Sequence, residues 1–267
     1  MKNMLSFVSQ ESYILDDFVL LISFLRSEDG CPWDRVQTHE SIRRNFIEEA
    51  YEAVEALDQG ELTHMREELG DVLMQVLFHT DIERAAGHFD IDDVADAACK
   101  KLVNRHPHVF GTPEQRAAGQ DWEAEKRRER GQTTVAESME SVSKALPGLW
   151  QAEKLQRKAA KVGYDWPDTE TAFQKIPEET EELREAIESG DTDAIEEELG
   201  DLLFAAVKVG RFCGVDPEHA IRRSCEKFIR RFRGVEQAVL DAGKRLENCT
   251  LEEMLDYYQN VKNQEKP

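Results

Sequence analysis

An acidic stretch occurs twice in the 267-residue chain, at residues 48–73 and 178–203, and 12 of its 26 positions are identical. In each copy, two acidic residues three positions apart are followed some sixteen positions later by a second such pair. Side chains three apart share one face of a helix, so each copy can gather four carboxylates between two antiparallel helices. The acidic residues are Glu49, Glu52, Glu68 and Asp71 in the first copy, and Glu179, Glu182, Glu198 and Asp201 in the second.

Four converging carboxylates would repel one another and lose solvation, and a divalent cation removes both penalties. Mg²⁺ prefers oxygen ligands, keeps some of its waters and often binds substrate phosphates as well. We therefore expect Mg²⁺ here, with Mn²⁺ as the alternative. A single acidic pair is usually just a solvated helix face, but here the same residues recur at the same separation, and an apolar run follows each copy.

Basic residues at helical spacing also recur. A lysine and an arginine four positions apart follow each acidic stretch, and residues four apart lie on one helix face. Such a pair could bind phosphates, although a solvated basic face is the alternative. The pairs are Lys101 with Arg105, and Lys227 with Arg231. In the second copy, Lys175 also lies one turn before Glu179, where the first copy has the neutral Asn45.

The composition limits the partners. Lys and Arg number 34 against 55 Asp and Glu, a formal charge of −21, and nucleic-acid backbones attract the opposite sign. No apolar run is long enough for a membrane span, and the N-terminal segment lacks the apolar core of a signal peptide. The five cysteines form no Cys-x-x-Cys pair, which favours reduced thiols in the cytoplasm. We therefore expect a cytoplasmic protein without nucleic-acid or membrane partners.

Helices must position these side chains, because no alternating strand pattern occurs anywhere in the chain. We predict an all-α fold of two tandem helical-bundle repeats, residues 1–110 and 146–267, joined by a linker over 111–145 that holds a charged, solvated helix near 126–130. The predicted helices of the repeats are 13–27, 40–58, 62–86, 91–105, 149–161, 169–189, 193–212, 217–240 and 250–262.

These motifs resemble the MazG family of nucleoside triphosphate pyrophosphohydrolases in its long, two-repeat form, over nearly the whole chain. The residues that carry the resemblance are Cys31-Pro32-Trp33-Asp34, Gln37-Thr38-His39, Glu48-Glu49-Ala50-Tyr51-Glu52, Glu67-Glu68-Leu69-Gly70-Asp71, Arg105-His106-Pro107-His108-Val109-Phe110, Gly163-Tyr164-Asp165-Trp166 and the second copy of the acidic motif. The resemblance implies an all-α homodimer that uses Mg²⁺ to hydrolyse NTPs or dNTPs to the monophosphate and pyrophosphate.

The resemblance also implies roles for individual residues. The four acidic residues of the second copy would be metal ligands, and their counterparts in the first copy are candidates for the same role. Nucleotide-binding candidates are Lys175, Lys227, Arg231 and Tyr258, with Lys101, Arg105 and Trp33 on the side of the first copy. In the mechanism that we expect, a metal-bound water attacks phosphorus in line. Glu197, beside Glu198, would orient or deprotonate that water.

Two other functions stay open at this point: a non-catalytic, metal-dependent nucleotide sensor or scaffold, and a structural acidic dimer without metal. The base and sugar preference and the cellular role, whether cleansing of the nucleotide pool or control of an alarmone, do not follow from the sequence. Because Lys175 and Tyr258 have no counterpart in the first copy, we predict that the second copy is the main catalytic site.

Overall fold

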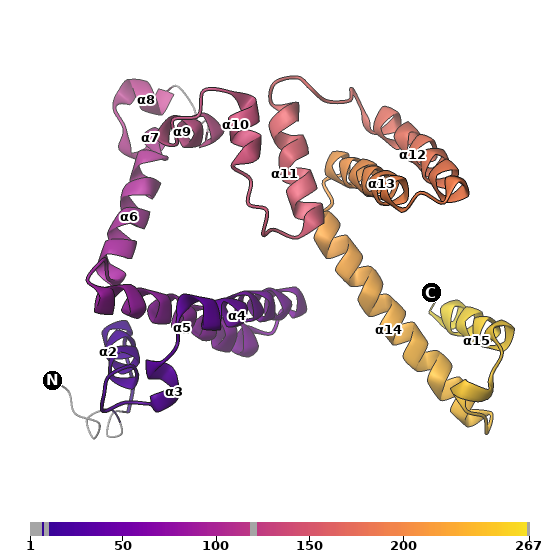
Figure 1. Ribbon diagram of the computed structural model, residues 1–267, viewed down its shortest axis with the longest axis horizontal. Helices are drawn as coiled ribbons and strands as arrows, with labels where there is room; N and C mark the ends of the chain where they lie inside the picture. Colours follow the sequence, from indigo (N-terminus) through magenta and orange to yellow (C-terminus); the bar gives the residue numbers. More distant parts are fainter. Residues whose placement is uncertain (1–6, 8–10, 118–121, 266–267) are drawn as a thin grey trace. The chain divides into compact units, whose positions relative to one another are not determined.

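The computed structural model describes residue 7 and residues 11–117 and 122–265, and all regular secondary structure in this part of the chain is helical (Figure 1). The predicted all-α class is therefore confirmed. The chain divides into two compact units, residues 1–122 and 123–267, so each acidic stretch lies in its own unit. No helix of the described residues is both long and apolar enough to cross a membrane.

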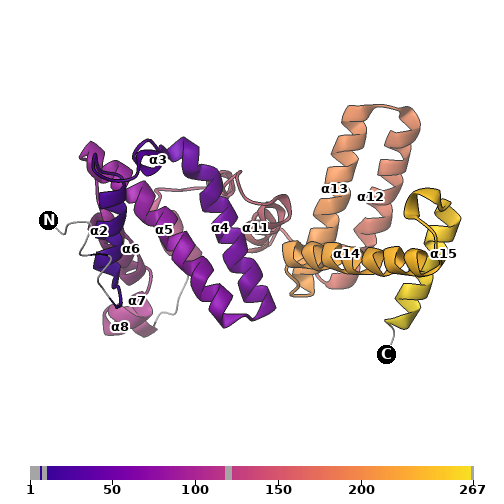
Figure 2. The same ribbon diagram turned by 90° about the horizontal axis from the view of Figure 1, so that it is seen from below.

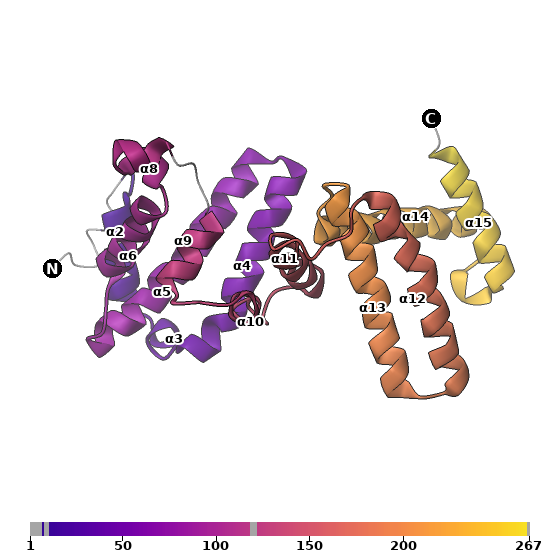
Figure 3. The same ribbon diagram turned by 90° about the horizontal axis from the view of Figure 1, so that it is seen from above.

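The N-terminal unit is built around two long antiparallel helices that carry the first acidic stretch (Figure 3). The predicted helices of this unit are confirmed, with ends shifted by at most two residues. The described residues of this unit also form three short helices of four or five residues that were not predicted, because a single turn is too short to show a period. The helices are α2 (Leu15–Leu25), α3 (Pro32–Arg35), α4 (His39–Gln59), α5 (Leu62–Ala86), α6 (Ile91–Asn104), α7 (Pro107–Phe110) and α8 (Pro113–Ala117).

Helix α4 of the α4–α5 hairpin has a well-defined cap at each end. Thr38 begins α4 by accepting a hydrogen bond from the backbone amide of Ser41, and Gly60 ends it with a φ of 72°. Glycine adopts this left-handed conformation without the strain that a side chain would cause. The apolar core of the unit holds the hairpin against α2 and contains Ile22, Ile42, Leu77 and Phe78.

The C-terminal unit repeats the long hairpin and adds a second helix pair. Its predicted helices are likewise confirmed to within two residues, and the charged helix expected near 126–130 is α9. The segment 111–145 contains short helices rather than extended chain, whereas its role as a linker stays a prediction. The helices from there on are α9 (Trp122–Glu129), α10 (Val135–Glu140), α11 (Gly148–Ala160), α12 (Thr169–Ser189), α13 (Thr192–Phe212), α14 (Pro217–Asp241), the 3₁₀ turn η1 (Leu246–Asn248) and α15 (Leu251–Gln264).

In the C-terminal unit, α12 and α13 form the acidic hairpin, with α11 against α13. The buried amide of Gln156 donates a hydrogen bond of 2.8 Å to the backbone carbonyl of Phe204 and so ties α11 to α13. Helix α14 runs from the base of this hairpin towards α15, which folds back along it (Figures 1 and 2). The approach is close, since a Cβ on Gly234 would lie 2.9 Å from a methyl carbon of Val261.

Candidate metal and nucleotide site

Three of the four acidic residues of the second repeat converge as their helical spacing predicts, whereas Asp201 is not part of this closest group. Glu179 and Glu182 of α12 and Glu198 of α13 each offer an oxygen, and these atoms lie within 4.8 Å of one another. Burial, and then the charges of the neighbouring carboxylates, raise the pKa values of Glu182 and Glu198. Asp201 is one of the carboxylates that act on Glu198. Mutual repulsion of this kind is what a bound cation relieves.

The first repeat contains a similar cluster of three, to which Asp71 belongs but Glu52, the counterpart of Glu182, does not. Glu49 of α4 lies with Glu68 and Asp71 of α5, again with oxygens within 4.8 Å of one another. Burial raises the pKa of Glu49, and the charges of Asp71, Glu52 and Glu68 raise it further. The carboxylate helices of both repeats therefore present comparable sets of hard oxygen ligands.

One carboxylate oxygen in the first repeat lacks a partner. Glu68 is buried, and its Oε1 lies 3.0 Å from Nε2 of His64, one turn earlier on α5. Its Oε2 is buried and has no hydrogen-bond partner among the described residues. A buried, unsatisfied carboxylate oxygen is strongly unfavourable in the absence of a ligand. The donor set and this orphaned oxygen both fit a divalent cation.

Lys175 lies beside the second cluster, as predicted. Its Nζ is 2.6 Å from Glu178 Oε1 and 3.1 Å from Glu179 Oε1. The hydrogen bonds to these two carboxylates raise the pKa of Lys175. Lys175 therefore stays charged and offsets part of the negative charge of the cluster.

A cleft of about 220 Å³ opens beside Lys175 and contains a second lysine, Lys208 of α13. Its Nζ lies 5.6 Å from the ring centre of Trp166, and burial lowers its pKa. Sequence reasoning named neither Lys208 nor Trp166 as a site residue. Lys208 follows Asp201 by seven positions, which places it two turns along the same helix face. The lining residues are Trp166, Ala172, Lys175, Glu179, Asp201, Phe204, Ala205 and Lys208.

The predicted phosphate-binding residues of α14 lie apart from this cleft. Arg231 donates a hydrogen bond of 2.8 Å from Nε to Glu265 Oε2, and its guanidinium carbon lies 5.9 Å from the ring centre of Tyr258. Lys227 is exposed. No hydrogen bond or ion pair of the described residues joins Lys227, Arg231 or Tyr258 to the acidic residues of α12 and α13. The structure thus groups Arg231 with Tyr258 but does not bring them to the carboxylates of the same chain.

The remaining predicted residues lie at the surface. Trp33 on α3 is 60% exposed, Lys101 is exposed near the end of α6, and Arg105 is the half-buried C-cap of that helix. Glu197 is exposed on α13 and outside the carboxylate cluster, but its charge helps to raise the pKa of Glu198. These roles stay predictions.

Comparison with known proteins identifies the repeated hairpins. The sequence model of the MazG nucleotide pyrophosphohydrolase domain matches residues 37–110 and 168–235. The chain is 41% identical, over 96% of its length and 98% of the relative, to the nucleoside triphosphate pyrophosphohydrolase/pyrophosphatase MazG of Thermotoga maritima. It is 37% identical to the nucleoside triphosphate pyrophosphohydrolase of Escherichia coli K12, over 94% of the chain and 98% of the relative. It also matches half of the larger, uncharacterized protein YabN of Bacillus subtilis, at 42% identity over 93% of the chain and 52% of that protein.

Proposed function

Because the chain belongs to the MazG nucleotide pyrophosphohydrolase family, we propose that it hydrolyses nucleoside triphosphates, NTPs or dNTPs, to the monophosphate and pyrophosphate. The observation that carries this proposal is the pair of carboxylate clusters, each within a stretch that matches the family domain. The experiment is incubation with a set of NTPs and dNTPs, with separation of the products. Monophosphate plus pyrophosphate supports the proposal, whereas diphosphate plus orthophosphate contradicts it.

We propose Mg²⁺ as the cation, held in the second repeat by Glu179, Glu182, Glu198 and Asp201. Mg²⁺ suits a set of carboxylate oxygens that leaves room for water and substrate phosphates. When bound, it supplies Lewis-acid stabilisation of the phosphates and lowers the pKa of a coordinated water. The first repeat offers Glu49, Glu52, Glu68 and Asp71 for the same purpose.

The side chains around the second cluster have distinct tasks in this proposal. A triphosphate carries about four negative charges near neutral pH, and some of them remain for basic side chains to meet. Lys175 would exchange Glu178 and Glu179 for a phosphate oxygen, and Lys208, which lines the same cleft, would bind another. Glu197, which is exposed beside the cluster, would accept a hydrogen bond from the water that attacks phosphorus.

We further propose a homodimer in which the two chains share each site. In this arrangement α14 and α15 of one chain cover the α12–α13 hairpin of the other, so that Lys227, Arg231 and Tyr258 meet the carboxylates of the partner. Two observations support it: these residues do not reach the carboxylates of their own chain, and large apolar side chains of the facing helices are exposed. The exposed side chains are Phe173, Leu203, Phe204, Phe228, Ile229 and Phe232.

Sharing of the site can be tested with two inactive variants. Glu198→Gln removes a carboxylate and Arg231→Gln removes a phosphate ligand, so each homodimer should be inactive. After the two are mixed and allowed to exchange subunits, random pairing gives heterodimers with one intact site, and about a quarter of the activity should return. No recovery, with exchange verified by a tagged chain, would contradict the shared site. A monomer in sedimentation at micromolar concentration would contradict the dimer itself.

Location in the cytoplasm and the absence of nucleic-acid partners stay predictions from composition. The cellular role can be approached through the same substrate set. Preferential hydrolysis of damaged or non-standard nucleotides would indicate cleansing of the pool.

A further inference from the structure

A pocket of about 450 Å³ in the C-terminal unit is lined by cations, in a chain with a net charge of −21. It lies between α9, α10, the loop that follows α10, and α11, and contains none of the residues assigned above to the hydrolytic site. The six basic residues that line it are Lys126, Arg130, Lys154, Arg157, Lys158 and Lys161.

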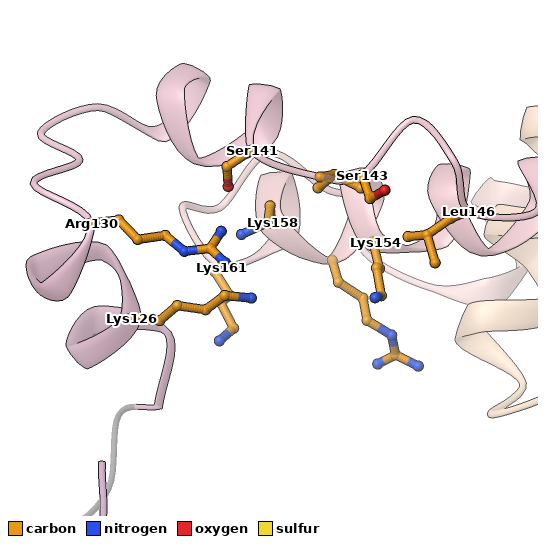
Figure 4. A pocket seen from close by; sticks show the side chains of 10 residues that line it. Lys126, Arg130, Ser141, Ser143, Leu146, Lys154, Lys158 and Lys161 are labelled. Atoms are coloured by element: carbon orange, nitrogen blue, oxygen red, sulfur yellow. The ribbon is translucent and has the colours of Figure 1, made fainter. Parts of the chain in front are cut away.

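Four of these side chains point towards one another from two separate helices (Figure 4). Lys126 and Arg130 extend from α9 and the residue after it, whereas Lys158 and Lys161 come from the last turn of α11 and its C-cap. Like charges brought together in this way repel unless an anion lies between them. The carboxylate clusters gather negative charge, whereas this pocket gathers positive charge. The same reasoning therefore assigns the pocket an anionic ligand.

Within the described residues, carboxylates neutralise only part of this charge. Arg157 pairs with Glu153 at 2.6 Å, and Nζ of Lys158 donates a 2.7 Å hydrogen bond to the hydroxyl of the buried Ser138, which fixes it at the wall of the pocket. No ion pair of the described residues involves Arg130, Lys154 or Lys161. Several positive charges therefore remain available to one ligand.

The lining also indicates what kind of anion fits. The apolar contribution comes from Val142 and Leu146, and the hydroxyl of Ser143 adds a neutral hydrogen-bond donor. The hydroxyl of Ser141 instead donates to the backbone carbonyl of Ser138 at 2.7 Å. Among the described residues, no aromatic side chain lines the pocket, so none of them offers a surface on which a base could stack. The volume exceeds what one phosphate group requires, and several cations at its wall match a multiply charged chain of phosphates.

We propose that this pocket is a binding site for an oligophosphate anion, separate from the carboxylate clusters and recognising the phosphate chain rather than the base. Inorganic pyrophosphate, inorganic tripolyphosphate and the phosphates of a nucleotide all contain such a chain and are all candidate ligands. Since binding here needs no divalent cation, the proposal stands independently of the proposed hydrolytic activity.

The test is calorimetric titration of the full chain with tripolyphosphate in the presence of EDTA, which withholds the cation that the carboxylate clusters need to bind phosphates. We expect saturable binding of one ligand per chain that weakens steeply as salt is raised. Pyrophosphate should bind more weakly because it carries less charge. ATP in EDTA should bind comparably to tripolyphosphate, and adenosine should not bind. Absence of saturable binding, or equal binding of adenosine, would overturn the proposal.

Variants locate the site. Arg130→Gln combined with Lys161→Gln removes two charges from exposed positions, and we expect at least a tenfold loss of affinity for tripolyphosphate. Lys100→Gln combined with Lys144→Gln removes the same charge from exposed lysines outside the pocket lining and should leave affinity unchanged. An equal loss in both double variants would reveal unspecific attraction. If Arg231→Gln lost affinity for tripolyphosphate and the pocket double variant did not, the anion would bind at α14 instead of in the pocket. Circular dichroism and melting temperatures of each variant verify that it is folded.

Discussion

Nζ of Lys175 lies 3.1 Å from Oε1 of Glu179, whereas the equivalent position of the first repeat holds the neutral Asn45. The two repeats therefore share their carboxylates but differ in the cation beside them. Lys208 adds to the difference, since the first repeat has the apolar Phe78 at its position. Beside its carboxylates, the second repeat therefore has two lysines at positions where the first repeat has neutral side chains.

Lys175→Gln should lower kcat/KM for an NTP about tenfold or more, because a hydrogen bond to a charged group contributes about 1.5–3 kcal/mol. Steady-state kinetics on one NTP at saturating Mg²⁺ provides the measurement. Asn45→Ala is the matched variant in the first repeat and should leave kcat/KM unchanged. Equal effects of the two substitutions would show that Lys175 does not distinguish the repeats.

Addition of Mg²⁺ or Mn²⁺ should raise the melting temperature, because a ligand that binds only the folded protein stabilises it by mass action. Asp201→Asn should remove the part of this gain that comes from the second repeat. In the double variant that carries both Asp71→Asn and Asp201→Asn, little of the metal-induced rise in melting temperature should remain. A thermal shift with the metal that persists undiminished in the double variant would exclude both clusters as the metal sites.

Metal binding should release protons and strengthen as pH rises. The pKa values of Glu49, Glu182 and Glu198 are raised by burial and by their neighbours, so these carboxyls bind more protons in the folded, metal-free protein than ordinary carboxyls do at the same pH. Because the cation binds the ionised form, affinity should increase with pH just above the ordinary carboxyl range and then level off. Calorimetric titrations with the metal in buffers of different ionisation enthalpy count the protons that are released. Identical heats of binding in all buffers would contradict the predicted proton release.

The sequence predicted the long helices and three of the four carboxylates of each cluster, for a physical reason. Both depend on local spacing: an apolar period over twenty residues determines a helix, and Glu49 and Asp71 each have an acidic partner three positions away that shares their helix face. Gly60 ends α4 at the turn between the two helices. Side-chain type and separation along the chain were sufficient, because α4 and α5 are consecutive in sequence.

Features that join distant segments were not predictable in the same way. The basic pocket unites Lys126 with Lys161 through the path of the 111–145 segment, which the sequence presents only as a charged run. Arg231 could be recognised from its repeated partner, but its hydrogen bond to Glu265 depends on how α15 returns along α14. Such contacts follow from tertiary packing and leave no period in the sequence.

A histidine cluster in the N-terminal unit is a further contact of this kind, and it predicts pH-sensitive stability. Nδ1 of His39 lies 2.6 Å from Nδ1 of His79, and Nε2 of His39 lies 2.6 Å from Oε1 of Glu83. Burial, and then the charge of His39, lower the pKa of His79. Hydrogen bonds from His39 and His88 lower the pKa of Glu83.

Both shifts have the same consequence. A group whose pKa is depressed by folding stabilises the folded state above its unfolded pKa, and this contribution is lost as pH falls. The melting temperature should therefore drop as pH is lowered through the ordinary histidine range and again in the carboxyl range. His79→Gln should remove the first of these drops, while His219→Gln, outside the cluster, should retain it. An unchanged profile for His79→Gln would contradict the assignment.

The most direct measurement of the central claim compares Glu198→Gln with Glu68→Gln on the same NTP with Mg²⁺, following release of monophosphate and pyrophosphate. The two substitutions neutralise equivalent carboxylates in the two repeats without changing side-chain size. We predict that Glu198→Gln abolishes most turnover, because its cluster has Lys175 and Lys208 beside it, and that Glu68→Gln retains most of it. Loss of turnover in Glu68→Gln with activity preserved in Glu198→Gln would contradict the assignment of catalysis to the second repeat.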